Sequence, residues 1–169
     1  MALTRDMLKK LFTANDNKLQ TGFTGMPIMC PVLSDNGMND LAYTLLLNED
    51  YPGWLHEILL GATTVWERWN SLDEDGHISS TGMNSLNHYS YGSVVEWIYR
   101  YVLGFRVDEA DPGAKHLCIA PSYNWDLKEA AGNFDSAAGD YKVAWKVIDP
   151  THVSLSLIHI SEPTRPRLI

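Results

Sequence analysis

Cysteine is scarce in this chain of 169 residues, which contains only Cys30 and Cys118. The two lie far apart in the sequence, and each stands among apolar residues, so the pattern predicts two buried free thiols and argues against a disulfide framework. No apolar run reaches the length of a membrane-spanning helix, and residues 1–10 lack the apolar core of a signal peptide. These absences leave the compartment open.

Basic residues are also in the minority, with 13 Lys and Arg against 21 Asp and Glu and a net charge of -8. This balance argues against nucleic acids and anionic membranes as partners. His56, His77, His88 and His116 do not follow metal-ligand spacing, so no metal site is predicted. No glycine-rich phosphate loop and no Ser-His-Asp arrangement stands out, and no cofactor is expected. The sequence leaves the oligomeric state open.

Apolar residues make up 45% of the chain, enough for a real core, and up to about residue 104 they recur at helical spacing. Thr4 is expected to cap a first helix, Pro27 to begin a second that ends near residue 34, and Asn39 to cap a third. Further helices are predicted from Trp54 to Leu60 and from Ser93 to Gly104. The first helix carries its apolar side chains on one face: Met7, Leu8, Leu11 and Phe12.

Beyond residue 104 the pattern changes to strands. Tyr141 to Val147 alternates between apolar and polar residues, His116 to Ala120 is a weaker strand, and residues 132–139 are predicted to be a loop. Residues 1–104 and 105–154 are therefore expected to be a helical and a β domain. One clear strand and one weak strand cannot close a sandwich, so the apolar faces of the β part should be partly exposed or covered by helices.

Residues 155–169 do not continue the alternating pattern in a useful way. They resemble what a transposon-type sequencing adapter encodes in one reading frame. We therefore expect this stretch to be a tail that is not native to the protein. The alternative is a natural, frayed C-terminus.

The segment Gly61–Trp69 carries the clearest chemistry, because Glu67 stands there between Trp66 and Trp69 after a run of small residues. The segment Asn84–Tyr89 follows, dense in short polar side chains. Aromatic faces cover the apolar side of a pyranose ring, while carboxylates and amides bind its hydroxyl groups. A carboxylate walled by indoles can also have a raised pKa, which suits proton transfer near neutral pH. The pattern predicts an aromatic-lined, concave sugar site that Glu67 and His88 both face.

Each of these residues also has a plainer interpretation. Glu67 could be a surface carboxylate on a helix, paired with Arg68 or Arg100. His88 could be a hydrogen-bonded core histidine, and tryptophans at such positions more often pack in a core than form a sugar platform. Asn84 and Asn87 could simply hold their loop through Asx turns.

The remaining carboxylates are poor candidates for a second catalytic group. An inverting glycosidase needs two carboxyl groups roughly 6.5–9.5 Å apart, one protonated and one ionised. The acidic run at residues 73–75 is more typical of a solvated loop. Glu57 lies on a separate helix ten residues before Glu67, and Glu96 lies beside the apolar stripe of its own helix.

Four segments together resemble the bacterial α-L-rhamnosidases of the inverting type: Thr21-Gly22-Phe23, Tyr51-Pro52-Gly53-Trp54, Gly61–Trp69 and Asn84–Trp97. The resemblance runs from the N-terminus to about residue 150. It implies a mainly α chain that forms the last part of an (α/α)6 toroid of six helical hairpins, followed by the start of a C-terminal β-sandwich.

The resemblance also implies roles for individual residues. Glu67 occupies the position of the general base, and His88 matches a histidine that hydrogen-bonds rhamnose. Apart from the resemblance, Trp66, Trp54 and Asn84 are expected near the sugar because of the aromatic and polar setting around Glu67. The general acid of the family lies on an earlier segment, and nothing in this chain matches that segment.

The expected function is hydrolysis of terminal α-L-rhamnose from glycosides or oligosaccharides, with inversion, by an enzyme of which this chain is a part without the general acid. Two alternatives remain. One is a non-catalytic module that binds sugar or has a structural role, and the other is a six-hairpin glycosidase that acts on a different sugar.

Overall fold

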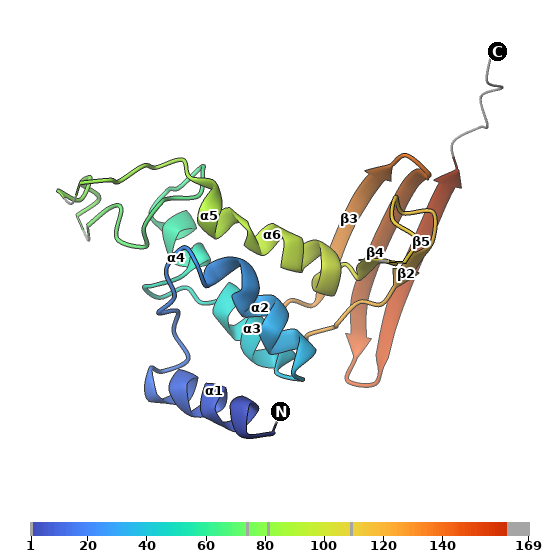
Figure 1. Ribbon diagram of the computed structural model, residues 1–169, viewed down its shortest axis with the longest axis horizontal. Helices are drawn as coiled ribbons and strands as arrows, with labels where there is room; N and C mark the ends of the chain where they lie inside the picture. The colour runs from blue at the N-terminus through green and yellow to red at the C-terminus, as the bar shows by residue number, and fades with distance from the viewer. Residues whose placement is uncertain (1, 74, 81, 109, 162–169) are drawn as a thin grey trace, which may run out of the picture. The chain divides into compact units, whose positions relative to one another are not determined.

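The computed structural model describes residues 2–73, 75–80, 82–108 and 110–161. The chain divides into two compact units, residues 1–95 and residues 96–169. Figure 1 labels their helices and strands. The division comes before the expected domain limit at residues 104 and 105, and that limit stays a prediction.

The first unit is helical, as the apolar spacing predicted. Its elements are α1 (Ala2–Ala14), α2 (Met26–Asp35), α3 (Asn39–Leu46), α4 (Trp54–Leu59) and α5 (Tyr89–Gly92). Helices α2 and α3 pack side by side, and their buried faces include Cys30, Leu33 and Leu45 (Figure 1). Pro27 in the first turn of α2 is compatible with the start of a helix, because backbone N–H groups in the first turn have no hydrogen-bond partner within the helix.

Several helix ends differ from the predictions. Helix α1 begins before Thr4, so this residue lies inside the helix and does not cap it. Met38, not Asn39, is the residue before the first turn of α3. In α1, Phe12 is buried but Met7 and Leu11 are more than half exposed, so the predicted apolar face is covered only in part.

The helix predicted from Ser93 to Gly104 is broken into pieces. Ser93 ends α5, and α6 (Val94–Trp97) runs into a π-helical turn, η1 (Ile98–Val102). The amide of Leu103 donates to the carbonyl oxygen of Ile98 at 2.8 Å, five residues earlier, which is the π-helical pattern. Gly104 then adopts a φ of +82°, where a Cβ would overlap the backbone of Ala120 and Pro121, so the helical stretch ends there.

The second unit continues with two antiparallel sheets. Strands β1 (Phe105–Val107) and β2 (Leu117–Ile119) form one, and β3 (Glu129–Ser136), β4 (Gly139–Asp149) and β5 (His152–Ser161) form the other, in that order (Figure 1). The predicted strands at 116–120 and 141–147 are confirmed.

The predicted loop at residues 132–139 is wrong, because residues 129–136 form β3 and pair with β4. Gly132 and Gly139 suggested a loop, yet Gly132 is needed inside the strand. A Cβ at this position would overlap the side chain of Leu103, so the glycine allows a close approach.

A small core joins the two sheets. Leu103, Phe105, Tyr141 and Val143 are buried together, and further side chains from β2 and β3 pack against them: Leu117, Ile119, Ala130 and Phe134. Trp145 is also buried and donates its indole N–H to the carbonyl oxygen of Val102 at 2.7 Å. The β part thus has more strands and a better covered apolar face than the sequence suggested.

Two further predictions about this unit need correction. Residues 155–161 do continue the β structure, because β5 pairs with β4 along its length. The non-native origin of residues 155–169 stays a prediction, and residues 162–169 lie outside the described residues. Cys118 is exposed on β2, whereas Cys30 is buried as predicted. Within the described residues, no helix is both long and apolar enough to cross a membrane.

Candidate active site

Glu67 lies in an irregular segment after α4 and is almost fully buried, at 8% exposure. Its backbone N–H donates to the carbonyl oxygen of Ser85 at 2.9 Å, and its Oε2 accepts the backbone N–H of Ser85 at 2.7 Å. The other oxygen, Oε1, makes no hydrogen bond to the described residues. The interpretation of Glu67 as an exposed helix carboxylate is therefore wrong.

The two segments singled out in the sequence lie together in the structure. Val65 accepts a hydrogen bond from the backbone N–H of His88 at 2.8 Å, and the Thr64 hydroxyl donates to the carbonyl oxygen of Leu86 at 2.6 Å. With the two bonds between Glu67 and Ser85, these contacts fasten residues 64–67 to residues 85–88. These bonds use the backbone, not the side chains, of residues 85–88.

His88 is half-buried and caps α5, where its Nδ1 accepts the backbone N–H of Ser90 at 3.3 Å. An accepting Nδ1 places the proton of the neutral ring on Nε2, which is then a hydrogen-bond donor. The ring stacks between Phe23 and Tyr89, with ring centroids 5.0 Å and 5.2 Å apart. Phe23 and Tyr89 are exposed, so this aromatic stack borders solvent.

The tryptophans form a buried aromatic cluster. Trp54 and Trp69 meet edge to face with centroids 5.4 Å apart, and Trp69 stacks on Tyr91 at 4.0 Å. Trp54 also donates its indole N–H to the carbonyl oxygen of Tyr91 at 3.0 Å. Trp66 is buried as well, at 3% exposure. This burial favours a packing role over a sugar platform, and the contact of Trp54 or Trp66 with sugar stays a prediction.

Asn84 holds its loop. Its Nδ2 donates to the carbonyl oxygens of Ser71 at 3.0 Å and Ser79 at 3.4 Å, while its buried Oδ1 has no hydrogen-bond partner among the described residues. These bonds fit the loop-holding interpretation. Contact of Asn84 with sugar stays a prediction.

Glu57, which the sequence did not favour as a second catalytic group, also contacts the segment that carries Glu67. It lies in α4, is 3% exposed, and its Oε2 accepts the backbone N–H of Trp66 at 3.4 Å. Burial raises the pKa of its carboxyl group to about 7, although the hydrogen bond from Trp66 acts in the opposite direction. Its Oε1 is buried without a partner among the described residues.

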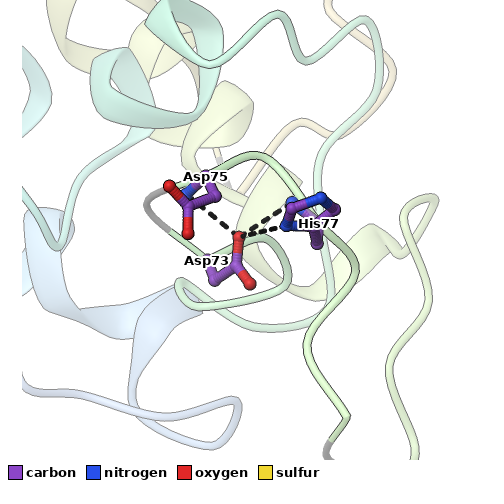
Figure 2. Close-up of side chains that lie close together, drawn as sticks. All are labelled: Asp73, Asp75 and His77. Carbon is purple, nitrogen blue, oxygen red and sulfur yellow. Dashed lines mark hydrogen bonds and ion pairs between the residues drawn. The ribbon is translucent and has the colours of Figure 1, made fainter.

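Three side chains in the predicted acidic loop gather near one another (Figure 2). Asp73, Asp75 and His77 bring one ligand-type atom each to within 4.8 Å of the others, and all three residues are exposed. Asp73 Oδ1 accepts the backbone N–H groups of Asp75 at 3.1 Å and of His77 at 2.8 Å. This is the geometry of an Asx-type turn, so it fits the prediction of a solvated loop and gives no reason to assign a metal.

Comparison with known proteins connects both units to one family. Residues 2–102 match the family described as the bacterial alpha-L-rhamnosidase 6 hairpin glycosidase domain, and residues 104–158 match the bacterial alpha-L-rhamnosidase C-terminal domain. The chain belongs to the bacterial α-L-rhamnosidase family. The resemblance found in the sequence is thereby confirmed, as is the order of a six-hairpin domain followed by a C-terminal domain with antiparallel sheets.

Individual α-L-rhamnosidases agree with this assignment. The protein from Alteromonas sp. (strain LOR) is 41% identical over 143 residues, which are 85% of this chain and 15% of that protein. The crystal structure of the Streptomyces avermitilis enzyme complexed with L-rhamnose is 39% identical, with a TM-score of 0.78 over 85% of this chain and 14% of that one. The Aspergillus terreus enzyme has a TM-score of 0.82 and 30% identity over 92% of this chain and 18% of that chain.

The chain thus spans less than a fifth of the length of these rhamnosidases.

Sequence reasoning missed the roles of Ser85 and Glu57 in holding the segment around Glu67. For Ser85 no signal was available, because it acts through its backbone. For Glu57 a signal existed, since an acidic residue at a buried helix position needs a partner.

Proposed function

We propose that this chain is part of an enzyme that hydrolyses terminal α-L-rhamnosides with inversion, and that Glu67 is its general base. Within this proposal the helical unit completes a six-hairpin toroid and the sheets begin a C-terminal β-sandwich. Membership of the α-L-rhamnosidase family supports the reaction class. The observation that carries the role of Glu67 is its carboxylate, which is fixed through Oε2 by Ser85 while Oε1 makes no hydrogen bond to the described residues.

This geometry suits proton abstraction from water. An oxygen fixed by a backbone N–H keeps the carboxylate in one orientation, and the second oxygen is available for a water molecule. In the step, Oε1 takes a proton while the water oxygen forms a bond to the anomeric carbon. The bond between that carbon and the leaving oxygen breaks on the opposite side, so the configuration inverts.

The leaving oxygen needs a proton from a second carboxyl group. We propose that this group is not among the carboxylates of this chain. Asp73 and Asp75 are exposed, and Glu57 is buried at 3% exposure with Oε2 bonded to the backbone of Trp66. His88 is proposed to bind the sugar, because its Nε2–H donor is available for a hydroxyl group and its ring is fixed by Ser90, Phe23 and Tyr89.

The test uses a complete enzyme that contains this chain. It can be made from the parental sequence or by grafting residues 2–158 in place of the matching part of the Streptomyces avermitilis rhamnosidase. Glu67→Gln keeps the shape and the Ser85 hydrogen bond but cannot take a proton from water. Turnover of an aryl α-L-rhamnoside should fall by about 10²–10⁴-fold while binding persists. Glu96→Gln, at an exposed position, is the matched control.

The product distinguishes the alternatives. NMR of the freshly released sugar should show the β-anomer first, since inversion converts the α configuration. Full turnover in Glu67→Gln would assign the base elsewhere. Hydrolysis of another sugar but not of rhamnose would support a different six-hairpin glycosidase, and saccharide binding without hydrolysis would support a binding module.

A further inference from the structure

We propose that Glu57 is a positioning residue for Glu67, because it fastens the segment that leads from α4 to the general base. This inference rests on the proposed role of Glu67. Glu57 does not touch the reacting atoms in this proposal. It acts through the backbone of Trp66, the residue directly before Glu67.

Glu57 holds both ends of the connecting segment. Its carbonyl oxygen accepts the backbone N–H of Ala62 at 3.0 Å, just after α4 ends. Its side-chain Oε2 accepts the backbone N–H of Trp66 at 3.4 Å, four residues later. One residue therefore closes the loop 62–66 against the helix.

The same segment is also held by residues 85–88. Thr64, Val65 and Glu67 all form hydrogen bonds to those residues. The backbone at 64–67 is thus held by two separate parts of the chain, the side chain of Glu57 and residues 85–88. Loss of the Glu57 contact would leave the backbone N–H of Trp66 without its partner and would remove one of these two attachments.

The surroundings of Glu57 make this contact costly to lose. Glu57 is buried at 3% exposure near Tyr91, whose pKa is raised first by its own burial and then by the charge of Glu57. Water cannot easily replace an acceptor there, so an unmatched Trp66 N–H would remain unsatisfied. Burying an ionisable carboxyl group destabilises its charged form, and the raised pKa of Glu57 reflects this desolvation. A carboxyl group at this buried position is explained if its oxygen is needed as the acceptor for the Trp66 N–H.

The first experiment compares two neutral substitutions of similar size in the complete enzyme. Glu57→Gln retains an oxygen that can accept the Trp66 N–H, whereas Glu57→Met fills the space without an acceptor. Because misplacing a catalytic group by about 1 Å can cost roughly 10²-fold, Glu57→Met should lower kcat by about 10–100-fold with little change in KM. Glu57→Gln should restore most of kcat. Glu49→Met, at an exposed position, is the control.

The second experiment needs no activity. Amide hydrogen exchange, followed by mass spectrometry on the 169-residue chain, should accelerate in peptides covering residues 64–67 in Glu57→Met but not in Glu57→Gln. Equal exchange and equal kcat in the two variants would overturn the positioning role. An inactive complete enzyme with the expected exchange difference would instead refute the proposed function while the loop contact stands. A lower melting temperature in Glu57→Met with unchanged kcat would reduce Glu57 to a structural residue.

Discussion

Protonation of Glu57 should make the stability of the helical unit depend on pH in an unusual direction. Burial raises the pKa of this carboxyl group from its ordinary value of 4.5 to about 7 in the folded chain. The folded state therefore holds the proton more tightly than the unfolded state. The stabilisation from this group is fully present below about pH 4.5, and it is lost as the pH rises through about 7.

The magnitude follows from the shift. A difference of about 2.5 pKa units corresponds to about 3 kcal/mol, since one unit is about 1.4 kcal/mol. Glu57→Gln has the same shape but no titrating proton. The free energy of unfolding of the wild type relative to Glu57→Gln should therefore fall by about 3 kcal/mol between about pH 4.5 and about pH 8.

Denaturant unfolding at a series of pH values measures this difference. Tryptophan fluorescence follows the unfolding of both units, because Trp54, Trp66 and Trp69 lie in the unit that contains Glu57 and three more tryptophans lie in the other. Taking the difference between variants cancels the signal and the titration of groups that both variants share. Glu49→Gln changes an exposed carboxylate in the same unit and should leave the curve parallel to that of the wild type. Parallel curves for Glu57→Gln as well would refute the reasoning, because they would mean that the buried carboxyl titrates alike in both states.

Three further outcomes are expected. A thiol reagent should modify Cys118 and not Cys30 in the native chain, since Cys118 is exposed whereas burial raises the Cys30 pKa to about 12. Unfolding should make the second thiol reactive, and rapid modification of both thiols in the native state would contradict the burial of Cys30. Trp145→Phe should destabilise the second unit by about 1–3 kcal/mol in thermal or denaturant unfolding, because the buried carbonyl of Val102 loses its donor, and an unchanged stability would argue against that bond. Residues 1–169 alone should not hydrolyse an aryl α-L-rhamnoside, because the proposed proton donor is absent, and clear turnover would place the acid within this chain.

The sequence predicted helices and strands best where apolar spacing and local chemistry agreed. Pro27 fits the start of α2, and the alternation from Tyr141 to Val147 fits β4. Prediction failed where the conformation of a residue depends on a contact with a residue far away in the sequence. Gly132 reads locally as a loop residue, yet it is a strand residue that leaves room for Leu103. No pattern of single residues contains that contact.

The site shows the same division. Glu67 and His88 are predicted from their neighbours in sequence and from the family resemblance, but the bonds that hold them come from the backbone of Ser85 and Ser90, which have no side-chain signature. Glu57 stands ten residues before Glu67 on another helix, so sequence spacing gives it no link to Glu67. Its contact with Trp66 depends on the turn after α4, which brings the segment back to the carboxylate.

The strand β5 has a practical consequence for handling this protein. It is the outer strand of its sheet, ten residues long, and has no proline or lysine. Four of its aliphatic side chains are about half exposed: Leu155, Leu157, Ile158 and Ile160. An open, apolar edge of this kind is a template for pairing with another chain. We therefore expect concentrated solutions of the isolated chain to self-associate through β5, and a charged residue at one of these exposed positions should reduce that association.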